Sequence, residues 1–385
     1  MNGPLGKIDP TLLVNDTYTL RLTATNVQGA ETVIEQNINV AGDLKLGNFT
    51  LSFNDLTLPV TGIPISVTRT YDSLGSNAQD EFGYGWRMEF RDTNLRTSVE
   101  KTGFEADLLY NPFRTGTRVY IQLPGGKREG FTFRPQLAPG IKGTYLGIYE
   151  PAFESDPGVT STLSVPKTDL LLTSDGDYIG FAGGAFNPSS PVFGGLFIVT
   201  TANGIAYDID GETGDLRSIT DPNGNELSFT DQAITSSAGP KVTFERDLNN
   251  RITAVIDPTG KRIQYQYDRS GDLVSVTDRA GNITRLEYRT DRPHYLDKII
   301  DPLGNTGVKT EYDASGRLVK VVDAAGKEVR QQYDFANSVV RVFDQLGNPT
   351  AYEYDSIGNV VTETNALGGI TRRTYEVDPN FRTTA

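Results

Sequence analysis

Residues 301–318 read Asp301-Pro-Leu-Gly-Asn-Thr-Gly-Val-Lys-Thr-Glu-Tyr-Asp-Ala-Ser-Gly-Arg-Leu318, and this pattern recurs through the second half of the chain. An Asp at the first turn position can bond its own backbone, Pro presets φ, and Gly accepts a positive φ. Asp301-Pro-Leu-Gly therefore predicts one chain reversal, and Tyr312-Asp-Ala-Ser-Gly predicts the next. The residues between two turns predict strands of about six or seven residues.

Two markers recur in register along residues 257–375. The repeat tyrosines are spaced by 21, 24, 21, 21 and 21 residues, and Asp follows four of them directly. The repeat positions are Tyr267, Asp268, Tyr288, Tyr312, Asp313, Tyr333, Asp334, Tyr354, Asp355 and Tyr375, with the turn glycines Gly260, Gly281, Gly304, Gly326, Gly347 and Gly368. An all-β fold is predicted, with a continuous antiparallel meander that adds one hairpin per repeat.

The two faces of the predicted sheet differ in character. Ile263, Tyr265 and Tyr267 share one face, but the position two residues before each repeat tyrosine is apolar in only half of the repeats. A sandwich needs a consistently apolar inner face. We therefore expect a curved, single-layer sheet with a solvent-lined face, an arc of a larger shell wall, stabilised by cross-strand aromatic contacts.

The residues before the repeats predict two further parts. Residues 11–42 alternate apolar and polar residues, which predicts a hairpin that resembles the last two strands of an immunoglobulin-like domain. Residues 43–200 predict short strands separated by Gly and Pro turns. Trp86, the only Trp, is expected to be a core anchor because its large ring buries much area; the alternative is a ligand platform. The expected domains are 1–42, 43–200 and 201–385, the last being the repeat array.

Composition limits the partners. The net charge of −13 and the pI of about 4.7 disfavour a phosphate-binding surface, so no nucleic acid is expected. Cysteine is absent, and no apolar run is long enough to predict a membrane span. No signal peptide is recognisable at the start, and we expect the sequence to be a segment of a longer polypeptide.

Candidate catalytic and metal sites are weak. His294 is the only histidine and lies in the insertion that lengthens one repeat, so it predicts a loop residue. Asp208-Ile-Asp-Gly-Glu-Thr-Gly-Asp lacks the Gly and Glu of a calcium loop and predicts a turn. No catalytic, cofactor-binding or metal-binding residue is predicted, and a non-enzymatic role follows. Tyr265 and Tyr352 are candidate sugar contacts.

The repeat resembles that of the Rhs or YD-repeat family, which includes bacterial polymorphic toxins, shell components of insecticidal toxin complexes and animal teneurins. The motifs from Gly47-Asn-Phe-Thr to Phe82-Gly-Tyr-Gly-Trp86 are similar to the module that often precedes these repeats, so the resemblance covers roughly residues 45–385. The family's self-cleaving aspartates follow its last repeat and have no counterpart here. No protease role is carried over.

The resemblance implies a spiralling sheet that closes as a hollow cocoon around a C-terminal toxic domain. The expected function is therefore a shell segment of a secreted or surface protein, which encloses or presents an effector. The alternative is an adhesion or carbohydrate-binding module. Expected partners are the remainder of the polypeptide and, for the alternative, glycans or a surface receptor.

Overall fold

The computed structural model describes residues 11, 13, 16–40, 45–89, 91, 93–124, 128–181, 183–356 and 358–374, so the repeat position Tyr375 lies outside the described residues. The chain divides into two compact units. Unit 1 comprises Met1–Leu51, Tyr71–Trp86 and Tyr265–Ala385, and unit 2 comprises Ser52–Thr70 and Arg87–Gln264. The division into domains 1–42, 43–200 and 201–385 stays a prediction.

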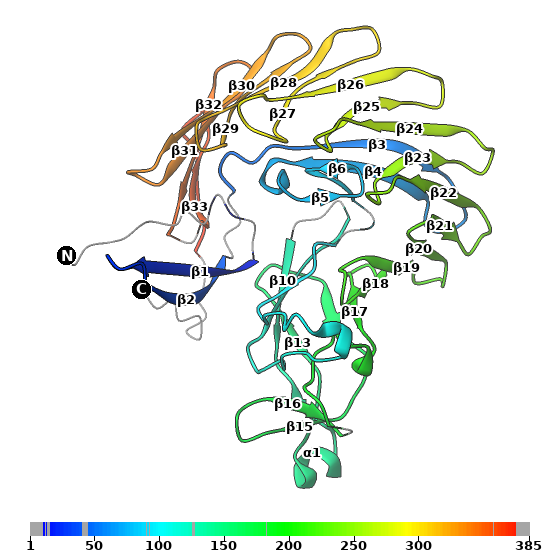
Figure 1. Cartoon of the computed structure of the whole chain (residues 1–385), viewed down its shortest axis with the longest axis vertical. Helices are drawn as coiled ribbons and strands as arrows, with labels where there is room; N and C mark the ends of the chain where they lie inside the picture. Colours follow the sequence, from blue (N-terminus) through cyan, green and yellow to red (C-terminus); the bar gives the residue numbers. More distant parts are fainter. Residues whose placement is uncertain are drawn as a thin grey trace. The chain divides into compact units, whose positions relative to one another are not determined.

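A 19-stranded antiparallel meander dominates the structure and confirms the all-β prediction. Each strand pairs with its neighbours in the chain, except that β17 also pairs back to β14. Figure 1 shows successive hairpins of the repeat region side by side, from green to orange. The strands are β14 (Thr162–Ser164), β17 (Leu196–Thr200), β18 (Ala206–Asp210), β19 (Leu216–Thr220), β20 (Glu226–Thr230), β21 (Ala233–Ser236), β22 (Lys241–Arg246), β23 (Ile252–Ile256), β24 (Arg262–Tyr267), β25 (Leu273–Thr277), β26 (Ile283–Tyr288), β27 (Leu296–Ile300), β28 (Thr306–Tyr312), β29 (Leu318–Asp323), β30 (Glu328–Asp334), β31 (Val339–Phe343), β32 (Pro349–Tyr354), β33 (Val360–Thr364) and β34 (Ile370–Arg372).

The turns of the meander follow the predicted chemistry. Asp301 Oδ1 accepts the backbone N–H groups of Leu303 at 2.9 Å and Asn305 at 2.8 Å. Gly304 has φ +88° and donates its N–H to the Asp301 carbonyl at 3.0 Å. The φ values of the other five turn glycines in this series are also positive, between 76° and 89°. The prediction that Asp and Gly reverse the chain at these points is confirmed.

The smaller elements of unit 2 form two four-stranded sheets and contain the helix. One sheet has the order β13-β10-β9-β8 and the other β11-β12-β15-β16. Phe113 packs edge to face against Phe133 and Phe186, and the rings of these two are tilted by 31° against each other. The elements are β8 (Arg96–Thr97), η3 (Glu105–Asp107), β9 (Arg118–Gln122), β10 (Arg128–Phe133), β11 (Gln136–Leu137), α1 (Ile141–Leu146), β12 (Ile148–Glu150), β13 (Phe153–Ser155), β15 (Leu170–Leu172), β16 (Tyr178–Gly180) and η4 (Pro191–Phe193).

The N-terminal residues form the predicted hairpin and a set of short strands. In the hairpin Leu22 lies opposite Ile34 on one face, and Arg21 pairs with Glu35 at 2.6 Å on the other. The hairpin is confirmed, whereas its membership of an immunoglobulin-like domain stays a prediction. The elements are β1 (Asp16–Thr25), β2 (Glu31–Val40), β3 (Thr50–Leu58), β4 (Ile65–Asp72), η2 (Ser73–Gly75), β5 (Gln79–Asp80), β6 (Gly83–Tyr84) and β7 (Trp86–Met88).

The expectation of a solvent-lined sheet face is wrong for strands β24 to β28. Tyr265 on this face is 3% exposed, and Leu286 and Thr310 at the equivalent repeat positions are also buried. The opposite face is polar and carries cross-strand ion pairs such as Lys298–Glu287 and Lys320–Glu311. The repeat pattern alone did not reveal the burial, because the residues that cover the face belong to a segment nearly 200 residues earlier in the chain.

Candidate functional site

The covered face of the repeat sheet meets residues 71–86, which we call the docking segment. All contacts described in this and the next three paragraphs lie within unit 1. Trp86 is fully buried, and its Nε1–H donates to the hydroxyl of the repeat residue Tyr288 at 2.9 Å. That hydroxyl in turn donates to the Leu273 carbonyl at 2.9 Å. The core-anchor prediction for Trp86 is confirmed, since an indole buried in this way satisfies its one donor.

Tyr71 forms the second anchor of the docking segment. Its hydroxyl donates to the His294 carbonyl at 2.9 Å and accepts the Leu296 N–H at 3.0 Å. Its ring lies 5.3 Å from that of Trp86. Burial raises the pKa of the Tyr71 hydroxyl well above its ordinary value, so the group stays protonated and able to donate. Tyr71 thus replaces a missing backbone partner where strand β27 begins.

His294 lies in the insertion, as predicted, but it is not an isolated loop residue. Its ring stacks on Tyr84 with 3.8 Å between centroids, and its Nδ1 lies 2.8 Å from Asp272 Oδ1. Its φ of +65° is one that His, Asn and Asp adopt more readily than other residues. Burial raises the pKa of the Asp272 carboxyl. The insertion therefore places a histidine where it joins the docking segment to the preceding repeat hairpin.

Close backbone approach fixes the position of the docking segment. The Phe82 ring lies 4.8 Å from that of Tyr265. A Cβ on Gly83, whose φ is +89°, would lie 2.5 Å from the carbonyl oxygen of Gly271. Tyr265, which we predicted as a sugar contact, is therefore inaccessible: this prediction is wrong, because Phe82 occupies the ring face that a sugar would need.

The repeat tyrosines join adjacent strands through their hydroxyls. Tyr288 donates to the carbonyl of Leu273, and Tyr333 donates to the carbonyl of Leu318, in each case 15 residues earlier. The Tyr333 hydroxyl also lies 2.7 Å from Gln331 Oε1. The period of the tyrosines predicted a structural position, but their hydrogen-bond acceptors are backbone atoms that no residue pattern marks.

An Asn directly after the turn glycine was missed by the sequence analysis. The side-chain amide of Asn305 donates to Asp301 Oδ2 at 3.0 Å, and four further turns repeat this bond. The hydrogen bond from Asn305 lowers the pKa of the Asp301 carboxyl, and the same cause acts at Asp278 and Asp344. The recurrence of Gly-Asn could have revealed the pair. The five pairs are Asp221–Asn225, Asp278–Asn282, Asp301–Asn305, Asp344–Asn348 and Asp355–Asn359.

The remaining candidates are the loop around Asp210 and the side chain of Tyr352. Asp210, within the loop that resembles a calcium site, accepts the backbone N–H groups of Glu212 and Thr213 and pairs with Arg217, as a turn residue does. Across the part of the chain that the structure describes, no three acidic or histidine side chains gather as a metal site. Nor is any helix in that part long and apolar enough to cross a bilayer. Tyr352 stays a predicted sugar contact and is half-buried.

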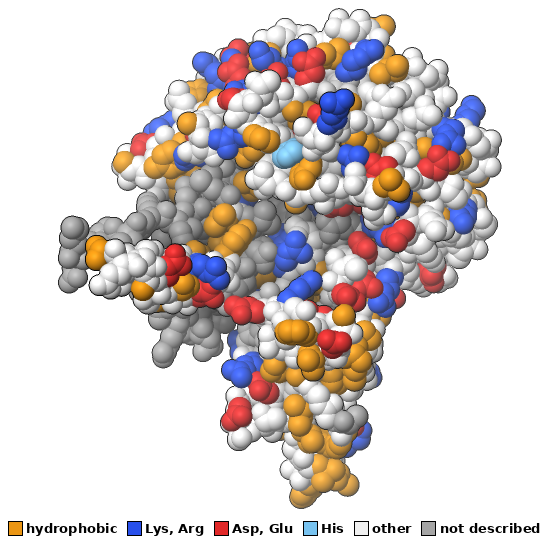
Figure 2. Space-filling view, in the orientation of Figure 1, with side chains coloured by type: hydrophobic (Ala, Val, Ile, Leu, Met, Phe, Trp, Pro, Cys, Tyr) orange, Lys and Arg blue, Asp and Glu red, His pale blue; other side chains and the backbone are white. Residues whose placement is uncertain are grey.

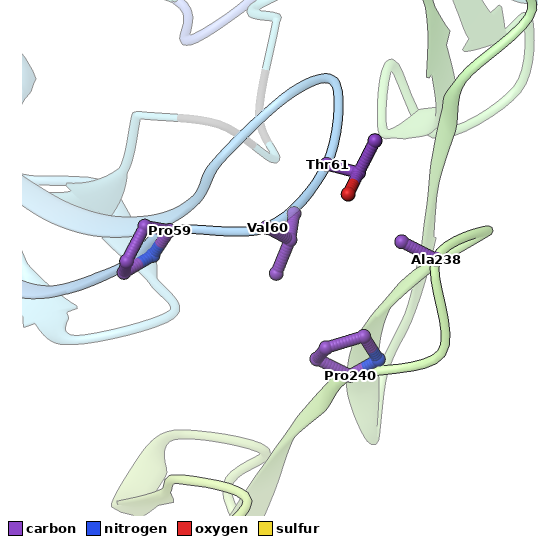
Figure 3. Close-up of a pocket in the computed structure, with 5 residues that line it drawn as sticks. All are labelled: Pro59, Val60, Thr61, Ala238 and Pro240. Carbon is purple, nitrogen blue, oxygen red and sulfur yellow. The ribbon is translucent and has the colours of Figure 1, made fainter.

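A hollow of about 480 Å³ in unit 2 is a poor small-molecule site. Figure 3 shows Pro59, Val60 and Thr61 of one loop facing Ala238 and Pro240 of a hairpin turn. Ligand sites combine apolar walls with several convergent polar groups. Of these five lining side chains, Thr61 alone offers a polar atom, so the hollow lacks the groups that would orient a ligand.

Family models match two parts of the chain. The RHS Repeat model matches residues 246–283 and 312–335, and a domain of unknown function, DUF6531, matches residues 43–106. The second match contains the docking segment. The first contains nine of the repeat positions, namely Gly260, Tyr267, Asp268, Gly281, Tyr312, Asp313, Gly326, Tyr333 and Asp334. No curated protein matches the chain.

Several solved structures are similar to the chain at low sequence identity. A crystal structure of TcdB2-TccC3 is 15% identical, with a TM-score of 0.30, over 91% of this chain and 21% of that one. A form without the hypervariable C-terminal region is 12% identical, with a TM-score of 0.28 over the same shares. A Photorhabdus luminescens Tc holotoxin pore is 11% identical, with a TM-score of 0.27, over 91% and 22%. The chain spans about a fifth of the length of these structures.

Proposed function

We propose that the chain, whose repeats match the RHS Repeat model, is a segment of a shell wall that encloses or presents an effector domain of the same polypeptide. In this proposal the protein is secreted or displayed at a cell surface, and its own residues perform no catalysis. Its partners are further repeats and the effector. The role of the chain is mechanical: it separates two environments and holds its own shape.

The observation that carries this proposal is the covered face of the repeat sheet. Trp86 and Tyr71 tie the docking segment to hairpins that lie about 200 residues later in the chain, through hydrogen bonds of 2.9 Å at Tyr288 and His294. A contact that joins a segment before the repeat array to hairpins within it stiffens hairpins that otherwise depend only on their neighbours. Stiffness of this kind is what a wall needs and what a flexible spacer lacks.

The two faces of the sheet also support a boundary role. One face carries ion pairs between neighbouring strands, such as Lys298–Glu287, while Tyr265 and Leu286 on the other face, and Phe82 and Trp86 of the docking segment, are buried. Exposed pairs of this kind contribute little to stability but keep a broad sheet soluble. A surface that is polar on one side and apolar on the other can face solvent outside and protein inside.

The test is limited proteolysis of the complete natural polypeptide, with detection of the segment that follows the repeats. We expect that segment to resist trypsin in the native protein and to be cut rapidly once urea has unfolded the array. Replacement of both Trp86 and Tyr71 by Ala should remove the protection under native conditions. If the segment is cut as fast in the native protein as in isolation, the wall proposal fails.

The carbohydrate-binding alternative has less support than the wall proposal. One of its two aromatic contacts, Tyr265, is buried beneath Phe82. A single half-buried ring at Tyr352 gives a weak platform, because sugar recognition needs polar groups that converge beside the stacking face. A glycan array decides the matter: saturable binding that is lost in Tyr352→Ala would favour adhesion over the wall.

A further inference from the structure

An uncharged apolar surface lies at the end of unit 2 that carries α1. Ile141, Tyr145 and Leu146 of this helix are 71%, 81% and 61% exposed, and Leu137 beside it is also exposed. We call these four side chains the apolar tip. Figure 2 shows hydrophobic side chains gathered over this end of the unit. A monomeric protein rarely leaves a contiguous group of large apolar side chains in water unless the group binds something.

The backbone presents the apolar tip in a fixed orientation. The N–H of Ala138 donates to the Ile148 carbonyl at 2.8 Å, which closes the loop at its base. The helix packs so closely on this base that a Cβ on Gly143 would lie 2.0 Å from the Ala138 carbonyl oxygen. Gly147 then ends the helix with φ +63°. The exposure of the four side chains therefore follows from a well-connected loop and not from a loose segment.

Charge is sparse in two segments of this unit, whereas residues 167–177 between them contain Lys167, Asp169, Asp175 and Asp177. Residues 136–149 contain one charged side chain, Lys142, and residues 178–207 contain none, although 22% of the chain is charged. The Nζ atom of Lys142 lies 2.6 Å from Asp169 Oδ2, so the charge is balanced within the protein. The apolar tip is thus electrically neutral, on a chain whose net charge is −13.

We propose that the apolar tip binds the surface of a zwitterionic phospholipid bilayer. Aliphatic side chains gain free energy when they leave water for the acyl region, and tyrosine favours the headgroup boundary, where its ring and its hydroxyl are both accommodated. The net negative charge of the chain disfavours anionic bilayers.

A lipid surface fits these observations better than a protein partner does. A specific protein interface carries about one hydrogen bond per 100–200 Å² and is enriched in Tyr, Trp and Arg, of which the apolar tip holds only Tyr145. Along residues 136–149, the exposed side chains offer few hydrogen-bonding groups, mainly those of Gln136, Thr144 and Tyr145. The acyl region of a bilayer requires no hydrogen bonds and adapts to a protruding group of any shape.

The experiment is flotation of the full chain with vesicles of palmitoyl-oleoyl phosphatidylcholine. We expect the wild type to float with the vesicles and to float less with vesicles of phosphatidylglycerol. The double substitution Ile141→Glu with Leu146→Glu should reduce the bound fraction about tenfold or more, because it places two carboxylates in the contact. Circular dichroism of the variant should match that of the wild type, since both side chains are exposed.

A matched control uses exposed leucines of the repeat turns. Leu303 and Leu346 are 87% and 83% exposed, so Leu303→Glu with Leu346→Glu makes the same chemical change far along the chain. We expect this control to float like the wild type. If both double variants lose vesicle binding equally, any exposed leucine can support binding, and the proposal is overturned. A wild type that does not float, or that prefers phosphatidylglycerol, would overturn it as well.

A spectroscopic variant reports the contact directly. Trp86 is fully buried, so its emission provides a constant background. In Tyr145→Trp, the emission of the new indole should shift to shorter wavelength when phosphatidylcholine vesicles are added. In Leu303→Trp, it should not shift. If the emission of the indole at position 145 does not shift when vesicles are added, the apolar tip does not insert, even if the protein floats.

Discussion

The repeat tyrosines act at the residue scale by donating one hydrogen bond to a neighbouring strand. We expect Tyr333→Phe to lower the free energy of unfolding by about 1 kcal/mol, the usual net value of such a bond. Tyr288→Phe should cost about 1–3 kcal/mol, because it also leaves the buried Nε1–H of Trp86 without its acceptor. Urea unfolding followed by circular dichroism measures both values.

The control for these substitutions is Tyr145→Phe, at a side chain that is mostly exposed. Its free energy of unfolding should stay within about 0.5 kcal/mol of the wild type. If Tyr288→Phe is as stable as this control, the hydroxyl chain from Trp86 to Leu273 does not stabilise the fold. The structure predicts that the loss in free energy of unfolding is largest for Tyr288→Phe, smaller for Tyr333→Phe and smallest for Tyr145→Phe.

The turn asparagines make a separate prediction about acid stability. The hydrogen bond from Asn305 holds the pKa of the Asp301 carboxyl below its ordinary value of 3.8, so the ionised carboxyl stabilises the fold above that value. The stabilisation is lost as pH falls through the lowered, folded-state pKa. We expect Asn305→Ala to be less stable than the wild type at neutral pH and to approach it once Asp301 is protonated in both.

Thermal unfolding between pH 7 and pH 2 measures the effect, with Lys327→Ala as the control. Lys327 occupies the same turn position relative to Asp323 and donates its backbone N–H, which the substitution keeps. The gap in Tm between this control and the wild type should not narrow in acid. A gap for Asn305→Ala that is constant over the whole pH range would contradict the role assigned to its amide.

At the scale of elements, substitutions of two turn glycines distinguish the cost of a steric contact from the cost of backbone strain. Gly83 and Gly304 have nearly equal φ values of +89° and +88°, but a Cβ on Gly304 would have no atom within 4 Å, whereas one on Gly83 would meet the Gly271 carbonyl. We expect Gly304→Ala to cost about 1 kcal/mol from strain alone. Gly83→Ala should cost about 2–4 kcal/mol, because the docking segment must also shift.

Fluorescence of Trp86 distinguishes the two variants further. In Gly83→Ala, displacement of the docking segment should let water reach the indole and shift its emission to longer wavelength. In Gly304→Ala, the emission should stay as in the wild type even where the stability falls. Identical spectra and equal losses of stability for the two variants would show that residues 71–86 tolerate displacement and do not anchor the sheet.

The elements that could be predicted from the sequence are those whose causes are local. Asp301 and Gly304 reverse the chain within four residues, so their pattern was sufficient. Tyr265 shows the opposite case: its burial involves Phe82, and no local sequence pattern connects these two residues. Trp86 was expected in a core because of its size, yet its acceptor Tyr288 lies 202 residues away. The partner of His294 likewise belongs to another hairpin.

At the scale of the whole molecule, the edge of the meander at β34 is the feature from which association can be predicted. In the described part of the chain, β34 pairs with β33 alone, and Ile370 on it is exposed. Arg373 donates its N–H inward to Val361, so the alternating N–H of Arg372 points to the free side. An unprotected edge of this kind recruits another strand. We therefore expect the chain to associate in a concentration-dependent manner through this edge.

Analytical ultracentrifugation of two variants at one position tests this expectation. Arg372→Pro removes the outward N–H and places a ring on the free side, so it should yield a monomer at all concentrations. Arg372→Ala removes the charge but keeps the N–H, and it should associate at least as well as the wild type. In the wall proposal, further hairpins are added to such an edge. If both variants lose association, the contact depends on the arginine side chain and not on strand pairing. A wild type that stays monomeric at high protein concentration would contradict the expected association through this edge.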